Sequence, residues 1–95
     1  MERRRLSEAE IARELGGLPG WELLDGKLRR EFTFPDFARA FGFMTGVALI
    51  AEAMDHHPEW SNVYNRVTIS LVTHDLGGVG TPDVEFARRV DALPR

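Results

Sequence analysis

The sequence predicts an α+β fold in which a four-stranded antiparallel sheet, made of two hairpins, carries three helices packed on one face. Two short segments alternate polar and apolar residues around tight-turn signals, which is typical of hairpins. One long segment repeats apolar residues at spacings of three and four, which is typical of a helix. Capping and breaking residues frame two further helices, so the predicted order is α-β-β-α-β-β-α.

The first helix and the first hairpin are marked by their ends. Ser7 and Glu10 form a capping-box pattern, which predicts a helix over residues 7–16 that stops at a pair of glycines. A strand over residues 21–24 then reaches Asp25-Gly26, a strong signal for a two-residue hairpin loop. The return strand is predicted over residues 27–34.

The longest helix is predicted between two prolines. Pro35 opens it, at a position where its missing N–H has little cost, and Pro58 ends it close to His56 or His57. The apolar residues at helical spacing are Phe37, Ala40, Phe41, Phe43, Met44, Val47, Ala48, Ile50 and Ala51. We expect this stripe, with its phenylalanines, to pack in the core as the central element of the fold.

The second hairpin pairs residues 59–63 with a following strand around a turn at Tyr64-Asn65. Apolar and polar residues alternate in that strand, which predicts one buried face. Its apolar residues are Val67, Ile69 and Leu71.

A glycine-rich stretch over residues 77–80 precedes the last helix. It lacks the lysine of a P-loop and the spacing of a dinucleotide fingerprint, so we interpret it as a tight connection rather than a phosphate site. Thr81, Pro82 and Asp83 then supply a helix cap, a first-turn proline and a first-turn acid.

Composition narrows the class of protein. The 95 residues fit a single domain over residues 1–95, with residues 1–6 expected to form a solvated arm that need not be ordered. A net charge of −3 gives no indication of a nucleic-acid partner, and the absence of cysteine excludes disulfides, thiolate metal sites and a cysteine nucleophile. No apolar run approaches the ~20 residues of a membrane span, and the N-terminus lacks a signal-peptide core. We therefore expect a cytoplasmic protein with no membrane partner.

All three histidines fall within residues 56–74. If the second hairpin turns where expected, its register places His74 level with Asp55. That position is adjacent to His56 and His57, so three imidazoles are predicted to line one end of the sheet.

The charges near these rings suggest different roles for them. A helix C-terminus, and Glu52 four residues earlier, both favour a protonated His56, which suits a general acid. His74 has no such bias from its local sequence and is the candidate base. Asp75 and Asp83 are near enough in sequence to orient a ring by accepting its second N–H.

Structural roles compete with these interpretations. A histidine before a proline can simply cap a helix by bonding its last carbonyls. Three histidines can also hold a catalytic zinc, but two adjacent histidines plus a hairpin partner do not match the usual ligand spacing, so no metal is predicted. Trp21 and Trp60 can either pack in the core or form the wall of a site for a flat heterocycle.

Several segments together resemble one enzyme family. They are Asp55-His56-His57-Pro58-Glu59-Trp60, Asn62-Val63-Tyr64-Asn65-Arg66-Val67, Thr73-His74-Asp75, Gly78-Val79 and Asp83, preceded by Phe34-Pro35-Asp36-Phe37 and Ala40-Phe41-Gly42-Phe43-Met44. Over most of residues 20–90 the chain is similar to the signature of the pterin-4a-carbinolamine dehydratases. It departs from that signature at Gly80, where relatives usually carry serine or threonine, so we expect Thr81 to take over the cap. The N-terminal segment matches only loosely.

The resemblance implies a function and a site. The reaction would be the dehydration of 4a-hydroxytetrahydropterin to the quinonoid dihydropterin without a cofactor, in a homodimer or dimer of dimers linked to an aromatic amino acid hydroxylase. The residues acting on the pterin would be His56, His57 and His74, supported by Glu52 and Asp83. The binding pocket would be formed by Asp55, Pro58, Val72, Thr73 and Asp75.

Within that reaction we assign His56 as acid, His74 as base and His57 as the ring that positions the substrate, although the acid and the base could be exchanged. The alternative is a binding protein, since some family members also serve as dimerisation partners of a transcription factor. Such a role would use a helical surface and would not need the histidines. A pterin-binding accessory protein without fast dehydration is a third interpretation, and the intact histidines argue against it.

Overall fold

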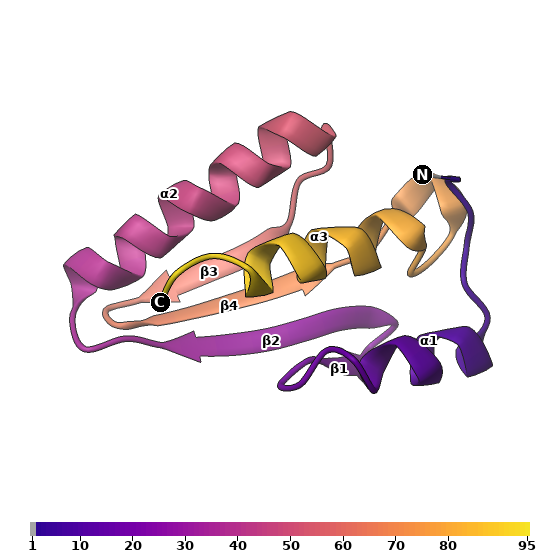
Figure 1. Ribbon diagram of the computed structural model, residues 1–95, viewed down its shortest axis with the longest axis horizontal. Coiled ribbons are helices and arrows are strands. Elements are labelled where there is room, and N and C mark those ends of the chain that lie inside the picture. Colours follow the sequence, from indigo (N-terminus) through magenta and orange to yellow (C-terminus); the bar gives the residue numbers. More distant parts are fainter. Residues whose placement is uncertain (1) are drawn as a thin grey trace.

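The computed structural model describes residues 2–95 and has the predicted fold class (Figure 1). The elements follow in the order α1 (Glu8–Leu15), β1 (Glu22–Leu24), β2 (Lys27–Thr33), α2 (Phe37–Met54), β3 (Glu59–Val63), β4 (Arg66–Leu71) and α3 (Thr81–Asp91). A short 3-10 helix that the sequence did not predict, η1 (His74–Leu76), lies between β4 and α3.

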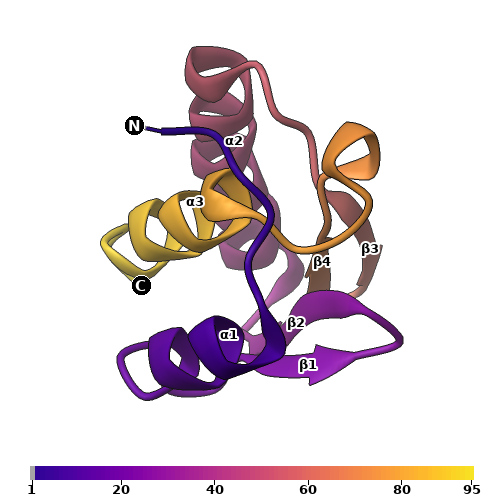
Figure 2. The same ribbon diagram turned by 90° about the vertical axis from the view of Figure 1, so that its right-hand side faces the viewer.

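The four strands form one antiparallel sheet in the order β1-β2-β4-β3, and the three α-helices lie on one side of it (Figure 2). β3 and β4 pair Glu59 with Ser70 and Val63 with Arg66, which is the register predicted for a turn at Tyr64-Asn65. β2 pairs with β4, so the two hairpins join through the middle of the sheet. The alternating strand β4 buries Val67, Ile69 and Leu71, as predicted.

The signals at the first helix and hairpin have the predicted geometry. The Ser7 hydroxyl accepts the N–H of Glu10 at 3.1 Å, and the Glu10 carboxylate accepts the N–H of Ser7 at 2.9 Å. Asp25 and Gly26 have φ of 52° and 74°, as a tight hairpin turn requires. Trp21 is a core residue, because its ring packs edge-on against Phe32 with the centroids 6.0 Å apart.

The ends of α2 differ from the prediction. The helix begins at Phe37 rather than Pro35, because the Asp36 carboxylate accepts the N–H of Arg39 at 2.8 Å and serves as N-cap. It ends at Met54, and Asp55 then takes a left-handed backbone conformation with φ of 50°. The chain therefore leaves the helix axis one residue before the histidines.

The buried face of α2 is narrower than expected. Its buried residues are Ala40, Phe43, Val47 and Ala51. Phe37 and Phe41 were predicted as core residues, and this is wrong, because the stripe that begins at Ala40 faces the protein and leaves Phe41 55% exposed. α2 is long enough and, with a mean hydropathy of 1.3, apolar enough to span a membrane by length and composition alone. The core helix of a soluble protein also meets these two criteria.

The N-terminal segment over residues 2–6 is not a free arm. Leu6 is buried, and its N–H donates to the carbonyl of Val79 at 3.0 Å. The N–H of Thr81 donates to the carbonyl of Arg4 at 2.9 Å, and Arg5 forms an isolated antiparallel bridge with Gly80. The arginine side chains stay exposed, but the backbone between them is tied to the start of α3.

The start of α3 also differs from the prediction, because the N-terminal segment packs against it. Gly80 is the N-cap and Thr81 is the first helical residue. The Thr81 hydroxyl donates to the carbonyl of Glu2 at 2.7 Å, so it serves the N-terminal segment and does not take over the cap as expected. The Asp83 carboxylate accepts the N–H of Gly80 at 2.8 Å and satisfies the first turn from within the helix.

Candidate active site

Three segments of the chain meet at one end of the molecule, namely the end of α2, η1 and the start of α3 (Figure 1). His56 and His57 follow α2, and His74 opens η1. Each imidazole has its Nε2 beside a carboxylate. The pairs are His56 with Asp83, His57 with Glu52, and His74 with Glu59.

His56 is the most enclosed of the three rings. Its side chain is 13% exposed, and its Nε2 lies 2.6 Å from Oδ1 of Asp83. The ring packs edge-on against Phe86 of α3 with the centroids 6.0 Å apart. Its backbone N–H caps α2 by donating to the carbonyl of Ala51 at 3.1 Å, so the ring is left free to reach α3.

Asp83 is fully buried and receives donors on both carboxylate oxygens. Oδ2 accepts the hydroxyl of Thr73 and the N–H of Gly80, each at 2.8 Å, while Oδ1 faces His56. Oδ1 is the oxygen that faces Nε2, so Asp83 engages this nitrogen of the His56 ring. The Nδ1 of His56 is therefore the ring nitrogen that remains for chemistry.

His57 and Glu52 form an exposed pair at the end of α2. The Nε2 of His57 lies 3.3 Å from Oε1 of Glu52. We expected Glu52 to act on His56, and this is corrected, because the left-handed turn at Asp55 carries His56 away from the helical face that Glu52 shares. His57 takes that place instead.

His74 is 79% exposed and lies beside a carboxylate of the neighbouring strand. Its Nε2 is 3.1 Å from Oε2 of Glu59, at the start of β3. Nζ of Lys27, from β2, donates to the other oxygen of Glu59 at 2.5 Å. The hydrogen bond from Lys27, followed by that from His74, holds the pKa of Glu59 below its ordinary value of 4.5.

Asp75 was predicted to bind substrate, but its carboxylate is occupied by the N-terminal segment. Arg3 donates to both oxygens, at 2.7 and 2.9 Å. These hydrogen bonds hold the pKa of Asp75 below its ordinary value of 3.8, and the nearby charge of His56 acts in the same direction. They also raise the pKa of Arg3.

The other predicted pocket residues divide by accessibility. Asp55 is exposed, and Pro58 and Val72 are half-buried, so their side chains retain surface beside the histidines. Thr73 is only 1% exposed, and its hydroxyl is used by Asp83. Its side chain is therefore not accessible from the surface.

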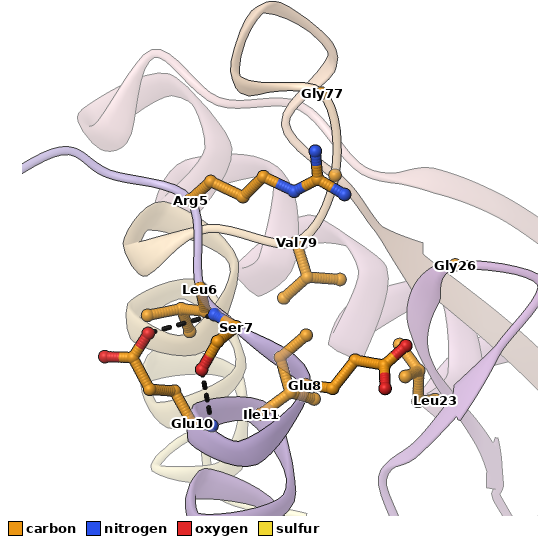
Figure 3. A pocket seen from close by; sticks show the side chains of 11 residues that line it. Arg5, Leu6, Ser7, Glu8, Glu10, Ile11, Leu23, Gly26, Gly77 and Val79 are labelled. Atoms are coloured by element: carbon orange, nitrogen blue, oxygen red, sulfur yellow. Dashed lines mark hydrogen bonds between the residues drawn. The ribbon is translucent and has the colours of Figure 1, made fainter.

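Two partly open hollows lie away from the histidines. One of about 530 Å³ is lined by residues of the N-terminal segment, α1 and the loop after η1, including Arg5, Ile11 and Val79 (Figure 3). Another of about 650 Å³ lies between α2 and the C-terminal residues, including Phe43 and Leu93. No histidine is among the residues lining either hollow.

The histidine site offers acid-base groups. Its three rings have different exposure and different carboxylate partners, an arrangement suited to moving protons in opposite directions. Within residues 2–95, no three histidine or carboxylate side chains gather in a way that would hold a metal ion.

A family model described as pterin 4 alpha carbinolamine dehydratase matches residues 4–93. The chain belongs to this dehydratase family. A relative from Solibacter usitatus that carries the family's name is 56% identical, and the match covers 94% of each chain. Another from Synechococcus is 62% identical over 80% of this chain and 82% of its own. A crystal structure from Brucella melitensis, described as a transcriptional coactivator/pterin dehydratase, is 48% identical with a TM-score of 0.89, covering 94% and 97% of the two chains.

Three residues of this candidate site were not predicted from the sequence, namely Arg3, Lys27 and Glu59. Glu59 follows the two histidines and Pro58, so its position was visible, but its contact with His74 depends on the β3–β4 pairing. Lys27 comes from the other hairpin, 32 positions away from Glu59, and Arg3 lies 72 positions from Asp75. No local pattern signals pairs at such separations.

Proposed function

We propose that the protein dehydrates 4a-hydroxytetrahydropterin, also called pterin-4a-carbinolamine, to quinonoid dihydropterin and water. Family membership supports the substrate class. The observation that carries histidine catalysis is the position of His56. Its Nε2 is held by the buried Asp83, at the same end of the molecule as the exposed rings of His57 and His74.

The reaction requires two proton transfers and no oxidant. The hydroxyl on C4a gains a proton and leaves as water with the electrons of the C–O bond. The N5–H loses a proton, and its electron pair forms the C4a=N5 double bond. One acid and one base therefore complete the reaction, and each such transfer typically contributes about 10²–10⁴-fold to the rate.

We assign the acid to His56 and the base to His74. The buried carboxylate of Asp83 fixes the ring of His56 at Nε2 and leaves Nδ1 to carry the proton for the leaving hydroxyl. His74 is open to solvent, so it can take up a proton and release it. His57 would bind and position the pterin, with Glu52 beside it. Asp55, Pro58 and Val72 would line the binding site of the pterin ring.

The cellular setting follows from the same chemistry. A 4a-hydroxypterin is produced by aromatic amino acid hydroxylation, so we propose that the protein works beside such a hydroxylase in cytoplasmic tetrahydropterin recycling. It would act as a homodimer or dimer of dimers. The exposed apolar side chains of α2, namely Phe37, Phe41 and Leu49, support such association.

The test follows the decay of 4a-hydroxytetrahydropterin by stopped flow, with and without the protein. The wild type should accelerate the decay, and His56→Ala and His74→Ala should each lower kcat by about 10²-fold or more. His57→Ala should act mainly on KM. Arg89→Ala, on the surface of α3, serves as control. If both His56→Ala and His74→Ala keep near-normal turnover, the mechanism is wrong.

A partner-binding role is the alternative, because the solved relative from Brucella melitensis is described as a transcriptional coactivator as well as a pterin dehydratase. Such a role would use the exposed apolar side of α2 and would be unaffected by His74→Ala. A folded wild type that leaves the decay rate unchanged would favour this alternative.

A further inference from the structure

We propose that Thr73 is a positioning residue for the dehydration, acting through Asp83 on His56. This inference rests on the proposed function, since it concerns the ring assigned as acid. The resemblance placed Thr73 among residues that bind the pterin. Its side chain is instead 1% exposed, and its hydroxyl donates to Asp83 at 2.8 Å.

The backbone around Thr73 fixes the direction of that hydroxyl. Its N–H donates to the carbonyl of Gly78 at 3.0 Å, and its carbonyl accepts the N–H of Gly78 at 3.3 Å. This pair closes the loop that contains η1, so Thr73 stands at the base of the segment that carries His74. The side chain that points inward from this base has only one hydroxyl proton, and Asp83 receives it.

The two carboxylate oxygens of Asp83 therefore have different hydrogen-bond partners. Oδ2 takes the Thr73 hydroxyl and the Gly80 N–H, which leaves Oδ1 directed at Nε2 of His56 at 2.6 Å. Without the hydroxyl, Oδ2 would keep a single donor, and the carboxylate could turn and release Nε2. His56 would then lose the contact that holds its Nε2–H, and with it the ring orientation in which Nδ1 carries the proton for the leaving hydroxyl.

The test compares Thr73→Val, which keeps the shape of the side chain, with Thr73→Ser, which restores the hydroxyl. Thr73→Val should lower kcat about 10–100-fold, the factor expected for losing a hydrogen bond to a charged group, with little change in KM. Thr73→Ser should return kcat to within a few-fold of the wild type. Thr68→Val makes the same change on β4 away from Asp83 and should leave kcat unchanged.

A second readout follows the ring of His56 itself, by ¹⁵N NMR at a pH where the ring is neutral. In the wild type and in Thr73→Ser the proton should lie on Nε2, and in Thr73→Val the ring should show a mixture of tautomers. A purely packing role for Thr73 would lower the melting temperature without moving this spectrum.

Each outcome is decisive for one of the two ideas. A Thr73→Val protein with wild-type kcat and an unchanged ring spectrum overturns the inference, as does a Thr73→Ser protein as impaired as Thr73→Val. If Thr73→Val does not fold, the wild-type spectrum still tests the inference. A neutral wild-type His56 with its proton on Nδ1 would overturn the inference. If the wild type shows no dehydratase activity, the proposed function fails, while the ring spectra still report whether Thr73 controls His56.

Discussion

Asp83 lies completely inside the protein, where an unpaired carboxylate is strongly disfavoured. Three donors compensate for its burial, from Thr73 after β4, Gly80 before α3 and His56 after α2. These are the three segments that form the site. The hydrogen bonds around this one residue therefore tie the three segments together beside the ring of His56.

Replacing Asp83 by alanine should lower the free energy of unfolding by about 3 kcal/mol. Three donors, two of them buried, would lose their acceptor, and each such loss typically costs about 1 kcal/mol or more. Urea denaturation provides the measurement. Glu85→Ala is the control on the same helix, because it removes only a surface pair with Arg89, worth about 0.3–0.5 kcal/mol. Equal losses in the two variants would contradict the assigned role of Asp83.

Lys27 and Glu59 permit a direct electrostatic test beside His74. Because the hydrogen bond from Lys27 is the main cause of the lowered pKa of Glu59, Lys27→Met should raise that pKa toward its ordinary value of 4.5. Lys27→Arg keeps the charge and should leave the pKa low. A ¹³C NMR titration of the Glu59 carboxyl measures the change. A Glu59 that titrates identically in wild type and Lys27→Met would show that the pair does not persist in solution.

Among the elements, α1 shows how a local signal specifies a helix start. Arg4 donates to both oxygens of Glu10, and Ser7 completes the capping box. The hydrogen bonds from Arg4, with those from Ser7, lower the pKa of Glu10 from 4.5 to about 2. A carboxyl whose pKa is lower in the folded state stabilises the fold above its unfolded pKa.

That stabilisation should be lost as the pH falls from about 4.5 to about 2, through the folded pKa of Glu10. Glu10→Gln keeps a capping-box side chain without the charge, so the variant should lose less stability over this interval than the wild type. Glu8→Gln, in the same turn, should retain the wild-type pH dependence. The measurement is the melting temperature across the interval. Parallel curves for wild type and Glu10→Gln would be inconsistent with the proposed ion pair.

Gly80 makes room for the N-terminal segment. A Cβ on this residue would lie 2.9 Å from the carbonyl oxygen of Arg4 and 2.8 Å from a methyl of Leu76. Gly80→Ser should therefore displace residues 2–6 and speed hydrogen exchange at the amides of Leu6 and Thr81, which bond across this junction.

Gly78→Ala is the matched control for this displacement. Its added Cβ meets only the flexible end of Arg5. Protection of the Leu6 and Thr81 amides should remain near the wild-type value. Retained protection in Gly80→Ser would mean that the segment tolerates the side chain.

The sequence predicted the elements well where the signal is local. The capping box at Ser7, the Asp25-Gly26 turn and the alternation in β4 each depend on residues a few positions apart. The buried side of α2 was predicted less well, because apolar residues surround this helix and spacing alone does not select the inner stripe. Phe41 has the right spacing and yet lies outside.

The site was predicted in part for the same reason. Hairpin register brought His74 to the end where His56 and His57 lie, and β3 and β4 have that register. The partners of the rings depend on tertiary geometry that no spacing contains. Because Asp55 has a left-handed conformation, His57 rather than His56 contacts Glu52. The salt bridge between Lys27 and Glu59 joins residues of two different hairpins.

For the whole molecule, the exposed apolar side of α2 predicts self-association. A single chain has a Cα radius of gyration of 12.9 Å, and α2 leaves Phe41 and Leu49 open to solvent. We expect a larger radius by small-angle scattering, and Phe41→Glu should return it toward the single-chain value. Leu24→Glu, an exposed apolar residue on β1, is the control. A wild type that is monomeric at all concentrations would exclude α2 as a self-association surface.

Asp83 both caps the first turn of α3 and contacts His56, and this has an evolutionary consequence. Because the same carboxylate begins α3 and holds His56, a descendant that abandoned the chemistry would still need it to fold. His57, exposed at the end of α2 and bonded only to an exposed Glu52, would be free to drift. When paralogues of this fold are divided into active enzymes and proteins that have lost the activity, the presence of His57 is therefore informative. The presence of Asp83 shows only that the fold is shared.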